Sequence, residues 1–142
     1  MNMQKTTEAF CILFAFCLFF SSCKSGNNSL WVSEKSDVQT ELNSFESEFM
    51  TLINQHRQSL SLNPLIFDSR LRDLVLKHSE EMAAGDIPFG HLGFLERCSE
   101  GKVIIGGGNL CAENVAMGQK TPQAVFSAWM GSTGHRGNIE QT

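Results

Sequence analysis

Apolar residues recur at helical spacing in the first half of the chain, and this pattern predicts two long helices. The first helix is expected over residues 41–60, with one apolar face. That face comprises Leu42, Phe45, Phe49, Leu52, Ile53 and His56. The second helix is expected between Asp68, a good N-cap, and Gly85, which suits the position after a helix. Its buried face is expected to comprise Leu71, Leu74, Val75, His78, Met82 and Ala83.

The second half of the chain predicts shorter elements. Residues 88–109 are rich in glycine and are expected to be mostly loop, and residues 112–117 are expected to form a short strand. Gly106-Gly107-Gly108 is only a weak phosphate-binding signal, because no Lys-Ser/Thr pair follows it. Thr121 and Pro122 predict the start of a third helix over residues 121–130. A last helical piece is expected over residues 135–139.

The N-terminus carries the longest apolar run, residues 9–20. These 12 residues are too few to span a bilayer core, which needs about 20. Such a run is typical of a secretory signal. It is followed by Ser21, Ser22 and Cys23, which resemble the lipobox of bacterial lipoproteins, where the leader is removed and the cysteine carries a lipid. Residues 1–22 are therefore predicted to be a lipoprotein signal peptide and Cys23 the lipidation site. An ordinary cleaved leader is the alternative.

The polar stretch that follows the leader divides the rest of the chain. Residues 23–40 are predicted to be a flexible tether and residues 41–142 a single domain, which is what a chain of 142 residues allows. The formal net charge of −4 argues against a generic nucleic-acid binder, because such a protein needs basic residues to replace phosphate counterions. The expected location is the cell envelope, with the domain tethered to a membrane and facing the periplasm or the exterior.

Two cysteines remain once the leader and the anchor are assigned. Cys98 and Cys111 lie 13 positions apart, and in an exported protein they are expected to form a disulfide. Closing such a loop contributes about 3 kcal/mol in the chain-entropy model. Two unpaired thiols are the alternative.

Six short motifs occur in an order and at separations that resemble the CAP superfamily (cysteine-rich secretory proteins, antigen 5, pathogenesis-related proteins), also called SCP domains, and above all its bacterial branch. They cover about residues 45–139. The motifs are Leu52-Ile53-Asn54-Gln55-His56-Arg57, Pro64-Leu65 with Asp68 and Leu71, His78-Ser79-Glu80-Glu81-Met82-Ala83, Phe89-Gly90-His91, Ala112-Glu113-Asn114-Val115-Ala116, and Trp129-Met130-Gly131-Ser132 with Gly134-His135-Arg136 and Asn138-Ile139. The resemblance implies an α+β fold, an α-β-α sandwich with a cleft lined by histidine and acidic side chains.

The resemblance also assigns residues to that cleft. His91 matches the first cavity histidine of the family and Glu113 the cavity glutamate. His135 belongs to the Gly-His-Arg motif and is expected to point into the same cleft. Ser132 stands where many members have a second glutamate. Asn114 and Trp129 are expected to be structural positions. His78 is expected to be a core histidine, and His56 to be structural or partly exposed.

The chemistry of this set leaves two roles open. Two imidazoles and one carboxylate can hold a divalent metal such as Zn²⁺ and leave a position for water, so His91, Glu113 and His135 form a candidate metal set. The same groups can act as general acid and base. Their separations of 22 and 22 residues are not those of a local metal motif. A Ser132–His135–Glu113 triad can be drawn but is not favoured.

Three functions follow from this reading. The first is a non-enzymatic lipoprotein that binds a lipid, peptide or cell-wall ligand through the cleft. The second is a metal-assisted hydrolase acting on peptide or cell-wall bonds, and the third an interaction module with a vestigial cleft. Because family members continue past the Asn-Ile motif and this chain ends at Thr142, the C-terminal sheet strands of the sandwich are expected to be missing. The domain is then expected to expose an apolar face and to be poorly stable in isolation.

Overall fold

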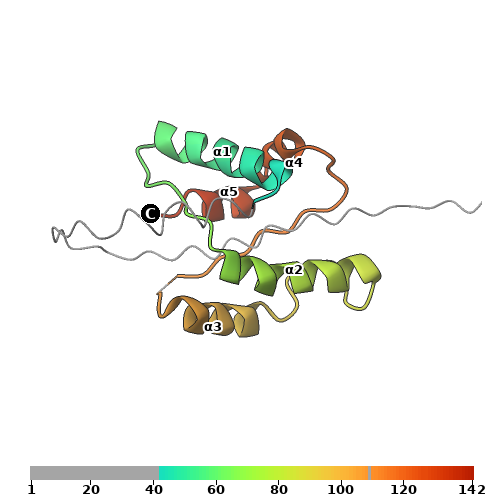
Figure 1. Cartoon of the computed structure of the whole chain (residues 1–142). Helices are drawn as coiled ribbons and strands as arrows, with labels where there is room; N and C mark the ends of the chain where they lie inside the picture. Colours follow the sequence, from blue (N-terminus) through green and yellow to red (C-terminus); the bar gives the residue numbers. More distant parts are fainter. Residues whose placement is uncertain (1–41, 109) are drawn as a thin grey trace, which may run out of the picture.

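The structure, a computed structural model, describes residues 42–108 and 110–142, a set of helices joined by extended segments (Figure 1). The predicted leader, Cys23 and the tether lie outside the described residues. In the part that is described, no helix is both long enough and apolar enough to cross a membrane. The helices are α1 (Ser44–Ser59), α2 (Ser69–Ala84), α3 (Phe94–Ile105), α4 (Pro122–Met130) and α5 (Thr133–Ile139).

Local capping signals set the ends of the helices that the sequence predicted. Asn43 and Glu46 form a reciprocal capping box at the start of α1. The side chain of Asp68 accepts a hydrogen bond from the Arg70 amide at the start of α2, and Gly85 ends α2 in the left-handed conformation. These helices, together with α4 and α5, confirm the predicted helices to within a few residues.

The prediction that residues 88–109 are mostly loop was wrong for α3. Gly93 and Gly106 lie just outside this helix, both with positive φ, so these two glycines bound a helix. Between them, Gly101 is the one glycine inside the helix, and it is buried. The many glycines around it made this helix of 12 residues look like loop. Apart from Gly101, the residues within it are compatible with a helix.

The predicted strand at residues 112–117 was also wrong. This segment is extended but contains only an isolated bridge at Asn114, and no strand is present in residues 42–108 and 110–142. A strand requires a neighbouring extended segment that pairs with it along its length. The segment instead uses side chains of the helices as partners, as described below. The sheet of the predicted α-β-α sandwich is therefore not confirmed.

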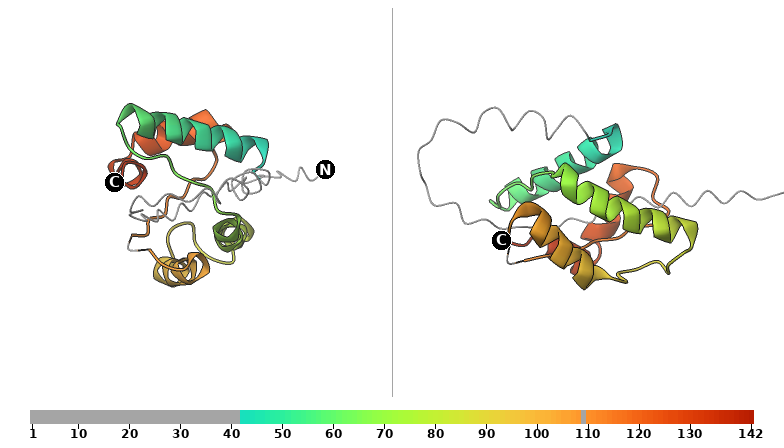
Figure 2. Two further views of the ribbon diagram at one scale, coloured as in Figure 1. Left: turned by 60° about the vertical axis from the view of Figure 1, so that its left-hand side comes forward. Right: turned by 60° about the horizontal axis from the view of Figure 1, so that its bottom comes forward.

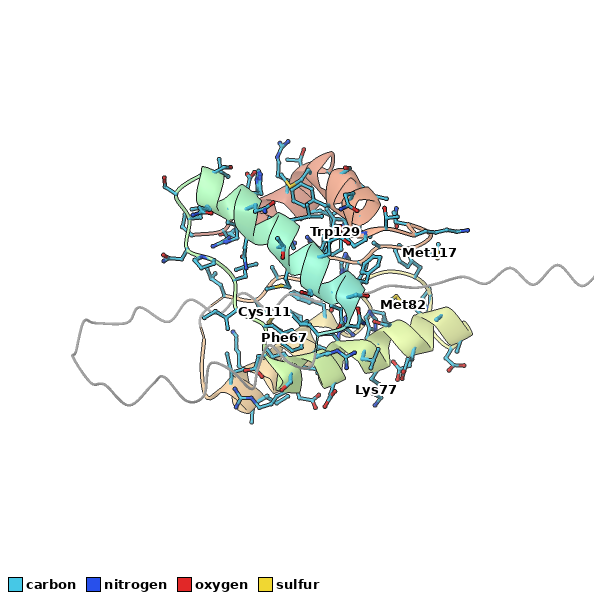
Figure 3. All side chains as sticks on the ribbon, turned by 45° about the horizontal axis from the view of Figure 1, so that its top comes forward. Phe67, Lys77, Met82, Cys111, Met117 and Trp129 are labelled. Atoms are coloured by element: carbon cyan, nitrogen blue, oxygen red, sulfur yellow. A yellow bond between two sulfur atoms is a disulfide. The ribbon has the colours of Figure 1, made fainter. Side chains whose placement is uncertain are left out.

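The helices form two groups, with connecting segments running between them (Figures 1 and 2). α1, α4 and α5 pack together in one group, and α2 packs on α3 in the other. The main core lies in the first group, which holds Trp129 (Figure 3). The Trp129 ring meets Phe49 edge to face at 5.1 Å between centroids. Its buried members are Phe49, Ile53, Ala116, Val125, Trp129 and Ile139.

A buried arginine joins the ends of α1 and α5. Arg57 is 1% exposed and donates hydrogen bonds to the carbonyls of Asn63, Ile139 and Gln141. The Ile139 carbonyl is at the C-terminus of α5, the negative end of the helix dipole, which favours a cation there. Burial lowers the pKa of Arg57, but an arginine remains protonated at any physiological pH. The neighbouring His56 ring pairs with Glu140 at 2.9 Å, which agrees with the structural role expected for His56.

Large apolar side chains are exposed on the described part of the chain, mainly in the group formed by α2 and α3 and in its connecting segments. The most exposed are Val103, Ile66 and Leu95, at 81%, 77% and 72%. The expected apolar face of a domain that lacks its sheet stays a prediction. The predicted low stability stays a prediction.

Candidate functional site

The extended segment that carries Glu113 is fixed to the α1–α4–α5 group by hydrogen bonds. The Asn114 side chain donates to the His135 carbonyl and accepts from the Asn138 side chain, at 3.1 and 2.8 Å. The Trp129 indole donates to the Val115 carbonyl at 3.2 Å. Asn114 and Trp129 are 3% and 2% exposed, so their predicted structural role is confirmed. The backbone of Glu113 is thereby held in place while its side chain reaches toward α3.

Arg97 binds the Glu113 carboxylate through both oxygens. Its Nε donates to Oε2 at 2.9 Å and its Nη2 donates to Oε1 at 2.8 Å. This two-pronged geometry is the strongest form of the arginine–carboxylate pair. The side chains of Arg97 and Glu113 are 13% and 4% exposed, so the pair is largely shielded from solvent. The charge of Glu113 is therefore neutralised by a side chain of the protein itself.

His78 supports the arginine from α2. Its Nε2 lies 3.0 Å from the Gly90 carbonyl, and its Nδ1 lies 3.1 Å from Arg97 Nη1. Because a carbonyl only accepts and a guanidinium only donates, Nε2 carries the hydrogen and Nδ1 is the acceptor, which is the neutral form of the ring. His78 is 2% exposed with both nitrogens satisfied, which confirms the predicted core histidine.

His91 is the exposed member of the group. Its Nδ1 donates to Glu113 Oε1 at 2.9 Å, and its side chain is 48% exposed. A neutral imidazole that donates through Nδ1 keeps its Nε2 as an acceptor. The buried carboxylate therefore fixes the orientation and tautomer of a ring that solvent can reach. Such a ring can accept a hydrogen bond from a ligand or remove a proton from one.

Burial raises the pKa of Glu113, but the hydrogen bond from Arg97 and then that from His91 outweigh it, so the net pKa lies below its usual value. The carboxylate is ionised at neutral pH. Its negative charge and the positive charge of Arg97 cancel, which leaves the site electrically neutral when His91 is neutral.

His135 and Ser132 do not join the hydrogen-bonded group. His135 lies on α5 with its ring 5.9 Å from the Trp129 ring between centroids. Burial lowers the pKa of His135, and the nearby His91 ring adds a smaller effect in the same direction. Ser132 is the N-cap residue of α5, although its side chain makes no capping hydrogen bond. In this structure Glu113 is paired with His91 and Arg97, so the Ser132–His135–Glu113 triad is not assembled.

The residues of the predicted metal set do not fit a metal ion in this arrangement. Both oxygens of Glu113 are engaged by Arg97, and Oε1 also accepts from His91. Throughout residues 42–108 and 110–142, no group of three or more His, Cys, Asp or Glu residues is placed to hold a metal. The chemistry available here is that of a carboxylate-oriented imidazole beside a fixed guanidinium.

Hollows lie on two sides of this group. One is an open groove of 390 Å³ between α2 and α3, and His78 and Arg97 contribute to its wall. The other is a void of 10 Å³ near the Asn114–Asn138 pair, about the size of a single water. His91 lines neither of these two hollows, and its 48% exposed side chain is reached directly by solvent.

A disulfide joins the two elements that carry the charged pair. Cys98 and Cys111 are bonded, as predicted, and their Cα atoms lie 6.0 Å apart. Cys98 follows Arg97 on α3, and Cys111 precedes Glu113 by two residues. The disulfide therefore links α3 covalently to the segment whose carboxylate Arg97 binds.

Sequence reasoning missed Arg97 as a member of this site. The residue lies within the range expected to be loop, and no motif singled it out. The available signal was the predicted disulfide, because pairing Cys98 with Cys111 brings residue 97 close to residue 113. The single charged residue adjacent to Cys98 was the natural partner for a buried glutamate.

Comparison with known families gives a match that spans this arrangement. The model of CAP, the cysteine-rich secretory protein family, matches residues 50–142. All of the residues that make the hydrogen-bonded group described above lie within that range.

Comparison with individual proteins gives a distant relative. The chain is 32% identical over 113 residues to the "Uncharacterized protein YkwD" of Bacillus subtilis (strain 168). The match covers 75% of this chain and 44% of YkwD, so the chain spans less than half the length of that relative. No solved structure matches the chain.

Proposed function

The chain belongs to the CAP family, the cysteine-rich secretory protein family, and from this we propose that it is an exported, lipid-anchored protein that binds a ligand or envelope component through His91. Cys23 carries the lipid, and the domain faces the periplasm or the exterior. The observation that supports binding at His91 is the exposed imidazole that Glu113 holds in one tautomer. A ligand that donates a hydrogen bond to Nε2, such as a hydroxyl or amide of a lipid, peptide or cell-wall component, suits this group.

Binding is favoured over catalysis by what His91 contacts. Among the described residues, the His91 ring forms no hydrogen bond to a Ser, Thr or Cys side chain that it would activate as a nucleophile. The alternative of a metal-assisted hydrolase gains no support, because the Glu113 oxygens are already engaged.

Substitution of His91 tests the binding proposal. His91→Ala leaves the Arg97–Glu113 pair intact, so the fold is expected to persist. In one arm, the full chain is sedimented with purified peptidoglycan. In a separate arm it is sedimented with phosphatidylglycerol vesicles, and here it carries Cys23→Ser so that the proposed lipid anchor cannot insert into them. We expect one arm to show binding that His91→Ala weakens about 5- to 12-fold, because the loss of one hydrogen bond between uncharged groups costs about 1–1.5 kcal/mol. Lys77→Ala, exposed on α2, serves as the matched control.

The binding proposal fails if His91→Ala and Glu113→Ala both leave every such interaction unchanged. Glu113→Ala removes the group that orients His91, so it is expected to reduce binding in the same arm. A loss confined to Lys77→Ala would move the binding surface to the groove between α2 and α3, which Lys77 lines.

Labelling tests the anchor independently of the ligand. Bacteria expressing the full chain are grown with radioactive palmitate, and the protein is followed in membrane and soluble fractions. Cys23→Ser is expected to abolish the label and to release the protein from the membrane fraction. Cys17→Ser, inside the predicted leader, is expected to change neither. Continued labelling of Cys23→Ser would contradict the proposed anchor.

A further inference from the structure

We propose that Arg97 is the resident cation of the His91–Glu113 site, a positioning residue that occupies the carboxylate positions a divalent metal would need. The site then presents His91 without any metal, whatever ligand it binds. This inference goes beyond the proposed function, because it concerns how the site is built and not which molecule it recognises.

The first support is the occupancy of Glu113. Its two oxygens accept three hydrogen bonds, two from Arg97 and one from His91, at 2.8 to 2.9 Å. A planar guanidinium matches a carboxylate as a fork, and it is charged at every physiological pH. A metal ion could bind Glu113 only by displacing one prong of this fork.

The second support is that Arg97 is held from its other side as well. Its Nη1 donates to the Leu92 carbonyl at 2.7 Å and to His78 Nδ1 at 3.1 Å. Four of the five N–H groups of Arg97 therefore have partners. His78 is itself fixed by the Gly90 carbonyl, so the guanidinium sits in a cradle of acceptors built by α2 and the turn before α3.

The third support is the turn that opens α3. Gly93 adopts φ of +76°, and a Cβ there would lie 3.2 Å from Arg97 Nη1. The absence of a side chain at this position gives the arginine room to fold back over the start of its own helix. Gly93 and the two acceptors around it therefore shape a place for a guanidinium.

The fourth support is electrostatic. A divalent ion near Glu113 would lie against the positive charge of Arg97, and displacing Arg97 would leave a nearly buried guanidinium without its carboxylate. Both outcomes oppose metal binding. His91 and His135 then remain as imidazoles, without the carboxylate that would complete a three-ligand set.

Zinc uptake tests the proposal. The full chain is dialysed against ZnCl₂ in a non-chelating buffer, and the zinc bound per chain is compared with that of His91→Ala, so that zinc held by cysteines elsewhere in the chain cancels. Wild type and His91→Ala are expected to take up equal zinc. A wild-type excess of one zinc per chain that His91→Ala removes would overturn the proposal.

Arg97→Met supplies the positive arm. Freeing the Glu113 oxygens is expected to raise zinc affinity at this site by about 10- to 100-fold, the range over which groups that contact metal ligands change metal affinity. The gained zinc should disappear in Arg97→Met/His91→Ala. A purely structural role for Arg97 predicts no such gain, so a folded Arg97→Met without His91-dependent zinc would overturn the proposal.

Arg97→Lys covers the case in which Arg97→Met fails to fold. Lysine retains the positive charge but cannot form the two-pronged pair with Glu113. The His91-dependent zinc uptake of Arg97→Lys is therefore expected to stay close to that of wild type. If Arg97→Lys takes up one zinc per chain that Arg97→Lys/His91→Ala does not, charge at residue 97 does not exclude metal and the proposal fails. Circular dichroism of each variant reports whether it is folded.

Discussion

Asn114 shows how a single side chain holds the candidate site to the main core. It is 3% exposed and bridges the His135 carbonyl and the Asn138 amide. Asn114→Ala removes both hydrogen bonds from partly buried partners, which we expect to lower the free energy of unfolding by about 1–3 kcal/mol. Urea unfolding followed by tryptophan fluorescence measures this. The exposed Asn63→Ala, whose side chain makes none of these hydrogen bonds, is the control, and equal losses in the two variants would contradict the bridging role.

Glu113 makes the stability of the fold depend on acid pH. Its pKa in the folded protein lies below the ordinary value of 4.5, chiefly because the Arg97 and His91 hydrogen bonds outweigh burial. Its stabilising effect is therefore complete above about pH 4.5 and is lost as the pH falls from there through the folded-state pKa. We expect wild type to be more stable than Glu113→Gln at pH 7, with a gap that narrows below pH 4.5. Urea unfolding across pH 3–7 checks this, and a constant gap would contradict it.

At the scale of the element, the starts of α4 and α5 differ in their caps. The Thr121 side chain accepts from the Ala124 amide, whereas Ser132 at the start of α5 makes no such bond. We expect Thr121→Ala to lower the free energy of unfolding by about 1 kcal/mol. Ser132→Ala should change it by clearly less, since no cap is lost. Thermal unfolding of the two variants compares them directly, and a larger loss for Ser132→Ala would show that its hydroxyl has another structural role.

The two glycines that bound α3 provide a matched pair. Both have positive φ, but a Cβ on Gly93 would meet Arg97 whereas one on Gly106 would meet nothing within 4 Å. Gly106→Ala is expected to lower the free energy of unfolding by about 1 kcal/mol through backbone strain alone. Gly93→Ala should lose more, and it should also disturb Arg97 and the orientation of His91. An unfolding titration compares their stabilities, and equal losses would mean that Arg97 does not need the space above Gly93.

At the scale of the whole molecule, the Cys98–Cys111 disulfide links α3 to the segment around Glu113, which hydrogen bonds hold to the other helix group. The loop between Cys98 and Cys111 spans 13 residues, and its closure is worth about 3 kcal/mol in the chain-entropy model. We expect Cys98→Ser/Cys111→Ser to lower the free energy of unfolding by about that amount and to loosen the Arg97–Glu113 pair. Dithiothreitol should destabilise wild type but scarcely affect the double variant. Equal sensitivity of both proteins to the reductant would contradict this assignment.

The sequence predicted what local chemistry decides and failed where distant partners decide. Asp68, Gly85, Thr121 and Pro122 act on their own helices, so the bounds of α2 and α4 were predictable. α3 was missed because Gly93 and Gly106 are typical of loops, and the sequence alone does not show that they stand at the two ends of one helix. The residues 112–117 were extended as expected, but whether an extended segment becomes a strand depends on a neighbour that its own sequence does not contain.

The candidate site divides in the same way. The resemblance to the family selected His91 and Glu113, and the structure brings these two together. It could not show that Glu113 is paired with Arg97, because that pairing depends on α3 turning back toward the segment at residues 110–113. His135 lies on α5 and Ser132 at its N-cap, and neither side chain joins the hydrogen-bonded group, which their positions in the motif did not reveal.

The disulfide between Cys98 and Cys111 also closes a covalent ring that contains the exposed glycines 106–108. A protease that cuts the backbone between Gly106 and Gly108 opens this ring without releasing either piece. Arg97 and Glu113 would then belong to two different polypeptides that remain bonded to each other. Such a nicked protein would migrate as one species on a non-reducing denaturing gel and as two after reduction, while its charged pair could still form.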